Sequence, residues 1–142
     1  MLELKIPENV SEIITKHIDE LALAIVGSSE LEELIDHHID GCLRGEISPS
    51  YLVKMTHLPG SRHERNDIHV LGEHVSLKNV YITSRVMAVS PDLKQVQTYS
   101  GSIYNISDIK VFEPPQNLIL HLCAALHSWR LGQYFGVLHV FY

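Results

Sequence analysis

The sequence predicts an α+β fold: an N-terminal helical hairpin plus a short helix, an antiparallel β-meander, a buried C-terminal helix and a final strand, all in a single domain over residues 1–142. Three observations predict this order. Apolar residues recur at three- and four-residue spacing in the first part of the chain, whereas they alternate with polar residues from residue 68 onward. A pair of prolines then precedes an apolar stretch long enough for a buried helix.

The first predicted helix follows Pro7, which suits a first helical turn, and ends at Gly27, which suits a helix C-terminus. Ser29 and Glu32 match a capping box and predict a second helix that ends at a following glycine. Because only two residues separate these helices, we expect them to pack as an antiparallel hairpin. The apolar face of the first helix consists of Val10, Ile13, Ile14, Ile18, Leu21 and Ile25.

A short third helix and a polar loop are predicted next. Ser48 and Pro49 resemble an N-cap and a first-turn proline, so the helix should run through about Met55 and complete an acidic helical part over residues 1–56. Residues 57–67 read as a loop because they are polar and contain Pro59 and Gly60. The loop holds a base, an acid and two cations, which are Arg62, His63, Glu64 and Arg65.

The remaining residues, 68–142, predict a meander followed by a core helix and a terminal strand. Strand candidates are residues 68–71, 80–89, 94–100 and 103–106. Residues 90–93 match a type I turn and residues 100–102 a tight hairpin turn, so the strands that they join should be antiparallel neighbours.

Pro114 and Pro115 predict the start of the last helix, about residues 116–131, which is apolar nearly all round and should lie in the core. Residues 135–142 are apolar on both faces of an extended chain. They predict an ordered final strand or a self-association surface that would make the protein a homo-oligomer. The residues expected to carry it are Phe135, Val137, Val140, Phe141 and Tyr142.

The formal net charge of −6 is unevenly spread, since residues 1–56 contain 4 basic and 11 acidic side chains. This distribution disfavours general nucleic-acid binding. Arg62 and Arg65 form a local basic spot through which a regulatory protein could contact nucleic acid. Cys42 and Cys123 form no Cys-x-x-Cys pair, and the N-terminus lacks the pattern of a signal peptide. These features predict a cytoplasmic protein in a reducing compartment, with no membrane association.

Motifs of catalysis and of cofactor binding are missing from the sequence. It contains no Gly-x-Ser-x-Gly elbow, no phosphate-binding loop and no dinucleotide fingerprint. The zinc-protease pattern fails because Asp67 stands where its second histidine belongs. The sequence therefore predicts no catalytic residues and no cofactor.

Two surfaces predict binding to another protein instead. An acidic stripe on the second predicted helix would attract a partner with a basic surface, and it consists of Glu32, Glu33, Asp36 and Asp40. Tyr81 and Arg85 would lie on one exposed face of the predicted strand 80–89, where Met87 follows and Tyr99 extends the face, and these residue types are enriched at interface cores. The sequence thus predicts a small non-catalytic protein-binding module. In its size, acidity and lack of catalytic motifs the chain resembles accessory proteins of phages and mobile elements, which implies an accessory or inhibitory role.

Histidines supply the main alternative. His17, His38 and His121 fall on apolar faces of predicted helices, and three converging imidazoles would suit zinc or iron in a metalloprotein or small metalloenzyme. The other interpretation is that each is a buried histidine hydrogen-bonded to backbone or to water. The ten histidines of the chain also predict that its charge, and hence its association with a partner, changes between about pH 5 and 7.

Overall fold

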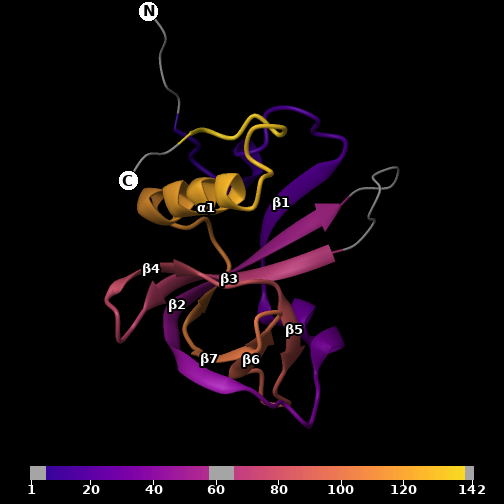
Figure 1. Cartoon of the computed structure of the whole chain (residues 1–142), viewed down its shortest axis with the longest axis vertical. Coiled ribbons are helices and arrows are strands. Elements are labelled where there is room, and N and C mark those ends of the chain that lie inside the picture. Colours follow the sequence, from indigo (N-terminus) through magenta and orange to yellow (C-terminus); the bar gives the residue numbers. More distant parts are fainter. Residues whose placement is uncertain (1–5, 58–65, 140–142) are drawn as a thin grey trace, which may run out of the picture.

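Eight strands form one mixed sheet in the computed structural model, which describes residues 6–57 and 66–139 (Figure 1). The strands are β1 (Leu21–Val26), β2 (Cys42–His57), β3 (Asn66–His74), β4 (Asn79–Ile82), β5 (Val86–Val89), β6 (Gln95–Thr98), β7 (Ser102–Ile106) and β8 (Ile109–Lys110). Two short 3-10 helices, η1 (Val10–Glu12) and η2 (Ser28–Leu34), and one α-helix, α1 (Gln116–Ser128), complete the elements. The fold is α+β only in outline, because strands dominate it.

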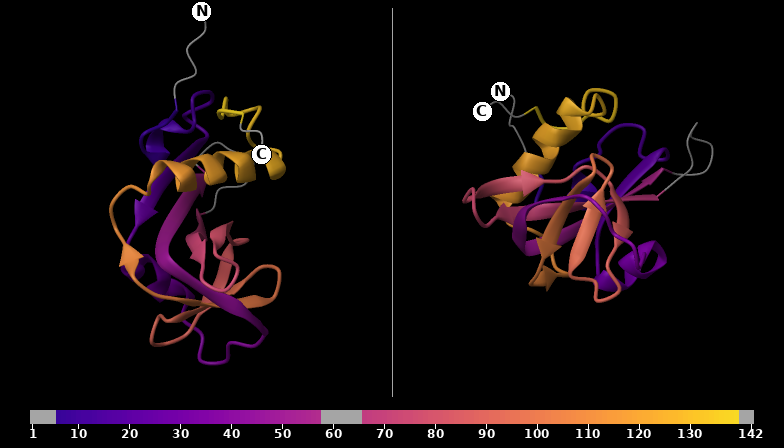
Figure 2. Two further views of the ribbon diagram at one scale, coloured as in Figure 1. Left: turned by 90° about the vertical axis from the view of Figure 1, so that its left-hand side faces the viewer. Right: turned by 60° about the horizontal axis from the view of Figure 1, so that its bottom comes forward.

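Strand β2 is the element to which most others attach. Its first half pairs in parallel with β7, and its second half pairs with β1 in antiparallel fashion. β3 runs antiparallel to it from Ile47 to Thr56, and β8 adds a short parallel pairing at Ser50 and Tyr51. The resulting order is β4-β3-β2-β7-β6-β5, and β2 curves strongly between its two halves (Figure 2).

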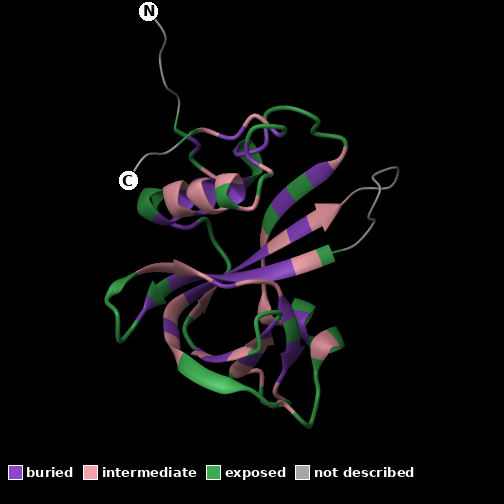
Figure 3. Ribbon diagram, viewed as in Figure 1, coloured by how far each residue is buried: buried purple, intermediate pink, exposed green. Residues whose placement is uncertain are grey.

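Two hydrophobic cores lie on opposite sides of β2. The first contains α1, η1, β1 and the second half of β2, together with Phe135 and Val137. The second fills the curled part of the sheet formed by β5, β6, β7 and the first half of β2, with Leu31 of η2 packed into it. Buried residues run along the strands between these two cores (Figure 3).

The predicted helical hairpin at the N-terminus is wrong. Residues 21–26, expected to end the first helix, form β1, in which Leu21 and Leu23 are buried while Ala22 and Ala24 are exposed. The sequence Leu-Ala-Leu-Ala-Ile-Val is too short to distinguish the period of a helix from that of a strand. Six backbone pairings with β2 make the segment a strand.

The second and third predicted helices are also absent. The second is replaced by the 3-10 helix η2, which buries Leu31 alone, and by a loop over residues 35–41. The third falls within β2, where Tyr51, Val53 and Met55 alternate with residues that face the other side of the sheet. Pairing with β3 and β1 on its two edges supplies the hydrogen bonds that make this segment extended.

The C-terminal half is closer to the prediction. β3, β6 and β7 overlap three of the strand candidates, and β5, β6 and β7 are successive antiparallel neighbours. The candidate over 80–89 is split, however, because Thr83 leaves the ladder. Its N–H donates to Val70 O at 3.0 Å and its hydroxyl accepts from Val70 N–H at 3.0 Å. These bonds attach the segment between β4 and β5 to β3, and the chain then continues into β5.

Helix α1 forms where it was predicted, and in the described structure only residues at its ends are exposed. It lies between the sheet and the two terminal segments of the chain (Figure 1). The predicted final strand is not present in residues 135–139, because Gly136 adopts a φ of 64° and the Val137 N–H donates to Gly132 O in a turn against α1. Residues 140–142 lie outside the described ranges. No helix within residues 6–57 and 66–139 is long and apolar enough to cross a membrane.

Replacing Gly72 with alanine is expected to lower the free energy of unfolding by about 3 kcal/mol, because the sheet is too close there for a side chain. A Cβ at Gly72 would lie 2.1 Å from the Pro49 carbonyl oxygen and 2.7 Å from Ile47 Cγ2, at the irregularity in the β2–β3 pairing. Gly101→Ala is the control, since no atom lies within 4 Å and only its φ of 85° costs energy, about 1–2 kcal/mol. Equal losses for the two variants in urea unfolding would contradict this close contact.

Candidate functional site

The half-buried side chain of Arg85 and the exposed side chains of Met87 and Tyr99 gather on the β5–β6 hairpin, and we call them the Arg85 cluster. Val86 pairs with Thr98, so the residues that flank this pair lie opposite each other, and the Tyr99 N–H donates to Arg85 O at 2.9 Å. Met87 sits on β5 at the bulge in this pairing. The antiparallel register therefore places three residues from two segments on one surface.

Contacts among the side chains hold the Arg85 cluster together. The guanidinium carbon of Arg85 lies 4.4 Å from the centroid of the Tyr99 ring, and Arg85 Nε lies 3.4 Å from Met87 Sδ. Tyr99 is 67% exposed and Met87 is 48% exposed. A cation–π contact at an exposed site contributes about 0.5–1 kcal/mol, enough to favour one arrangement of these side chains in the free protein.

An acidic segment, residues 32–40, adjoins the same hairpin. Its acidic side chains are all exposed. They are the predicted binding residues Glu32, Glu33, Asp36 and Asp40. The Asp36 N–H donates to Val89 O at 2.9 Å, and just beyond the segment the Cys42 N–H donates to Gly101 O at 3.3 Å. Both ends are thus attached to the β5–β6–β7 meander. The four carboxylates lie on η2 and the following loop rather than along a helix, so the predicted helical stripe is replaced by a surface loop.

Tyr81 lies elsewhere, at the second core. Its hydroxyl is 2.7 Å from the Tyr104 hydroxyl, and its ring meets the ring of His74 edge-on at 5.4 Å. His74 Nδ1 accepts a hydrogen bond from the Leu77 N–H, so Nε2 carries the proton that it donates to Arg44 O. The sequence predicts Tyr81 and Arg85 on one exposed strand face, but the break at Thr83 separates them.

Replacing Tyr104 with phenylalanine is expected to cost about 1 kcal/mol of stability at neutral pH, because the Tyr81 hydroxyl loses its partner. Burial and the hydrogen bond with Tyr81 raise the pKa of Tyr104 to about 12, above its ordinary value of 10.0. The unfolded chain therefore loses this proton first, and the native protein should lose stability as the pH rises from about 10 to about 12. Urea unfolding at several pH values checks this, and an equally steep decline in the Tyr104→Phe variant would contradict it.

The three histidines proposed as metal ligands occupy three different settings. His17 stacks on Tyr134 with 3.9 Å between ring centroids, and its Nδ1 lies 3.1 Å from Glu20 Oε2. His38 is exposed in the acidic segment, where its N–H donates to Asp36 Oδ1. His121 is on α1, and partial burial lowers its pKa. Among the residues that the structure describes, no three His, Cys, Asp or Glu side chains are grouped to hold a metal ion.

The residues predicted for self-association and for nucleic-acid binding lie in the first core or outside the described ranges. Phe135 and Val137 are each 7% exposed and belong to the first core, so their apolar side chains are already covered within the chain. The other predicted residues of these two sets lie outside the described ranges, and they are Val140, Phe141, Tyr142, Arg62 and Arg65, together with the loop residues His63 and Glu64.

Comparisons with models of known protein families, with curated proteins and with solved structures find no match to this chain. Its function is therefore argued from the geometry of its own residues. The sequence predicts Arg85, Met87 and Tyr99 on one strand face, and the β5–β6 register brings Tyr99 beside Arg85.

Proposed function

We propose that this protein is a non-catalytic binding module whose partner is a protein with a basic surface. The observation that carries the proposal is the Arg85 cluster: an arginine stacked at 4.4 Å on a tyrosine that is 67% exposed, with an exposed methionine beside it. Arginine, tyrosine and methionine are enriched at the centres of protein interfaces. Large side chains held in place by neighbours lose little conformational freedom on binding, which favours affinity.

The acidic segment supports the chemistry proposed for the partner. Its four exposed carboxylates belong to a segment attached at Val89 and Gly101 to the meander that carries the Arg85 cluster, in a chain whose net charge is −6. Such a surface speeds the encounter with a positively charged partner and disfavours acidic ones, while the apolar contacts at the centre supply most of the affinity. The partner should therefore present an apolar or aromatic pocket for Tyr99 and Met87, bordered by lysine or arginine.

Reversing the charge of Glu32, Glu33 and Asp40 to lysine is expected to weaken capture of the partner by tenfold or more at low salt and less at high salt. Asp36 is left unchanged because its carboxylate accepts the His38 N–H and shapes the loop. The partner would be captured from a lysate of the native cell and identified by mass spectrometry.

A matched triple variant controls for net charge in that experiment. It reverses Glu8, Asp19 and Glu73, three exposed residues that lie outside the acidic segment. The proposal is supported if the native chain and this control capture a protein that the acidic-segment variant does not capture. Equal loss of capture in both triple variants would show that only the net charge matters, and unchanged capture in both would remove the acidic segment from the interface.

Truncating Tyr99 to alanine is expected to weaken binding of the same partner by about 2 kcal/mol, the loss typical of an aromatic residue at an interface centre. Folding should be unaffected, because the side chain is mostly exposed. Leu77→Ala is the control, since Leu77 is 60% exposed on the β3–β4 turn, away from the β5–β6 hairpin. Titration calorimetry measures the difference, and equal affinities of the two variants would contradict a central role for Tyr99.

A further inference from the structure

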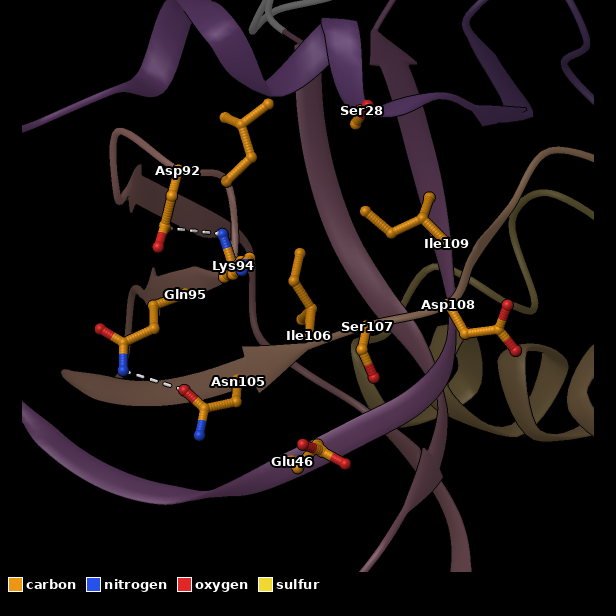
Figure 4. A pocket seen from close by; sticks show the side chains of 11 residues that line it. Ser28, Glu46, Asp92, Lys94, Gln95, Asn105, Ile106, Ser107, Asp108 and Ile109 are labelled. Atoms are coloured by element: carbon orange, nitrogen blue, oxygen red, sulfur yellow. Dashed lines mark hydrogen bonds between the residues drawn. The ribbon is translucent and has the colours of Figure 1, made fainter.

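A pocket of about 780 Å³ lies at the other end of the β5–β6 hairpin from the Arg85 cluster. Its walls come from the hairpin turn, the end of β7 and the chain that follows, Glu46 of β2, and Ser28 of η2 (Figure 4). Sites for small molecules commonly have volumes of about 300–1,000 Å³ and combine apolar walls with a few polar groups. The size of this pocket falls within that range.

Three polar side chains form a row across the pocket. Gln95 of β6 pairs with Asn105 of β7, and Asn105 pairs in turn with Glu46 of β2. Cross-strand partners present their side chains on the same face of a sheet, about 5 Å apart. The row therefore joins residues 46, 95 and 105, which the chain itself separates widely.

Hydrogen bonds within the protein satisfy only some of the polar groups. Asp92 accepts from the Ser90 hydroxyl and the Lys94 N–H, which lowers its pKa, and Asp108 pairs with Lys110 at 3.0 Å. The Gln95 side-chain amide donates to Asn105 Oδ1 at 2.9 Å.

Two charged groups of the pocket remain for a ligand. Among the described residues, the half-buried carboxylate of Glu46 makes no side-chain hydrogen bond or ion pair, and the exposed ammonium of Lys94 makes none either, although its charge helps to lower the pKa of Asp92. The Gln95 carbonyl oxygen and the Asn105 amide nitrogen are likewise free to bind, because the bond between these residues uses the other atom of each amide. A half-buried carboxylate without a hydrogen-bond partner, an exposed ammonium and two amide groups thus line one cavity.

Apolar and strained residues complete the lining. Leu93, Ile106 and Ile109 supply an apolar wall that continues the second core. Leu93 and Asp108 adopt φ values of 61° and 52°, a left-handed conformation that costs about 1–2 kcal/mol outside glycine. Such strained residues concentrate at binding sites, where the surrounding structure holds them in place.

We propose that this pocket binds a free amino acid or a similarly small zwitterion with an apolar side chain. Glu46 would accept hydrogen bonds from the ligand's ammonium group, and Lys94 would bind its carboxylate. The amide groups of Gln95 and Asn105 would orient it, and Leu93, Ile106 and Ile109 would contact its side chain. The proposal concerns a different site from the docking surface and does not depend on it.

Three probes and two variants test the assignment of the two charged residues. The probes are L-leucine, L-leucine amide, which lacks the carboxylate, and N-acetyl-L-leucine, which lacks the ammonium. L-Leucine should shift the backbone amide signals of Gln95, Ile106 and Asp108 in NMR titrations, and each blocked analogue should bind about tenfold more weakly.

The variants should then discriminate between the analogues. Glu46→Gln should weaken the binding of L-leucine and L-leucine amide about tenfold but leave that of N-acetyl-L-leucine unchanged. Lys94→Gln should weaken the binding of L-leucine and N-acetyl-L-leucine about tenfold but leave that of L-leucine amide unchanged. Controls are Glu73→Gln and Lys78→Gln, which change the same charges on exposed residues outside the pocket. The proposal is overturned if L-leucine causes no saturable shifts up to roughly 10 mM, tenfold above a millimolar dissociation constant, or if all three probes bind equally.

Discussion

The backbone hydrogen bonds of β2 hold the two halves of this protein together. The strand is 16 residues long and pairs with β1, β3, β7 and β8, so every strand of the sheet except β4, β5 and β6 is bonded to it directly. Its side chains alternate between the two cores, because successive residues of a strand point to opposite faces. Tyr51, Val53 and Met55 pack with α1, while Ile47 and Leu52 pack with the curled part of the sheet.

The curvature of β2 depends on close approach at two points. Gly72 of β3 lies against Pro49, where a side chain would meet the carbonyl oxygen, and Gly45 leaves space for the ring of His74. His74 in turn hydrogen-bonds to the backbone on both sides and packs against Tyr81 and Tyr104. Bending the strand there brings its first half beside β7, which is the pairing that places Glu46 next to Asn105.

The β5–β6 hairpin connects this scaffold to both proposed sites. One end presents the Arg85 cluster beside the acidic segment, and the other end supplies Leu93, Lys94 and Gln95 to the pocket. The two ends differ in chemistry, since one carries an exposed aromatic ring stacked on an arginine and the other lines a pocket with polar groups. A single hairpin can therefore serve a protein partner and a small ligand without sharing a residue between them.

The sequence by itself determined those elements that depend only on residues close together in the chain. The double proline before α1, the Ser-Gly-Ser turn between β6 and β7, and the alternation in β6 each identify their structure within a few residues. The unequal charge of the two parts of the chain and the exposure of the acidic segment could also be anticipated from sequence.

Tertiary structure decided the N-terminal half and the composition of both sites. Residues 21–26 satisfy a helical and an extended pattern equally well, and their partner is the far end of β2, some thirty residues along the chain. The break at Thr83 separates Tyr81 from Arg85, the β5–β6 register brings Tyr99 to Arg85, and pairing across three strands brings Glu46 to Gln95. Such placements arise from hydrogen bonds between distant segments, and a pattern read along one segment holds no information about them.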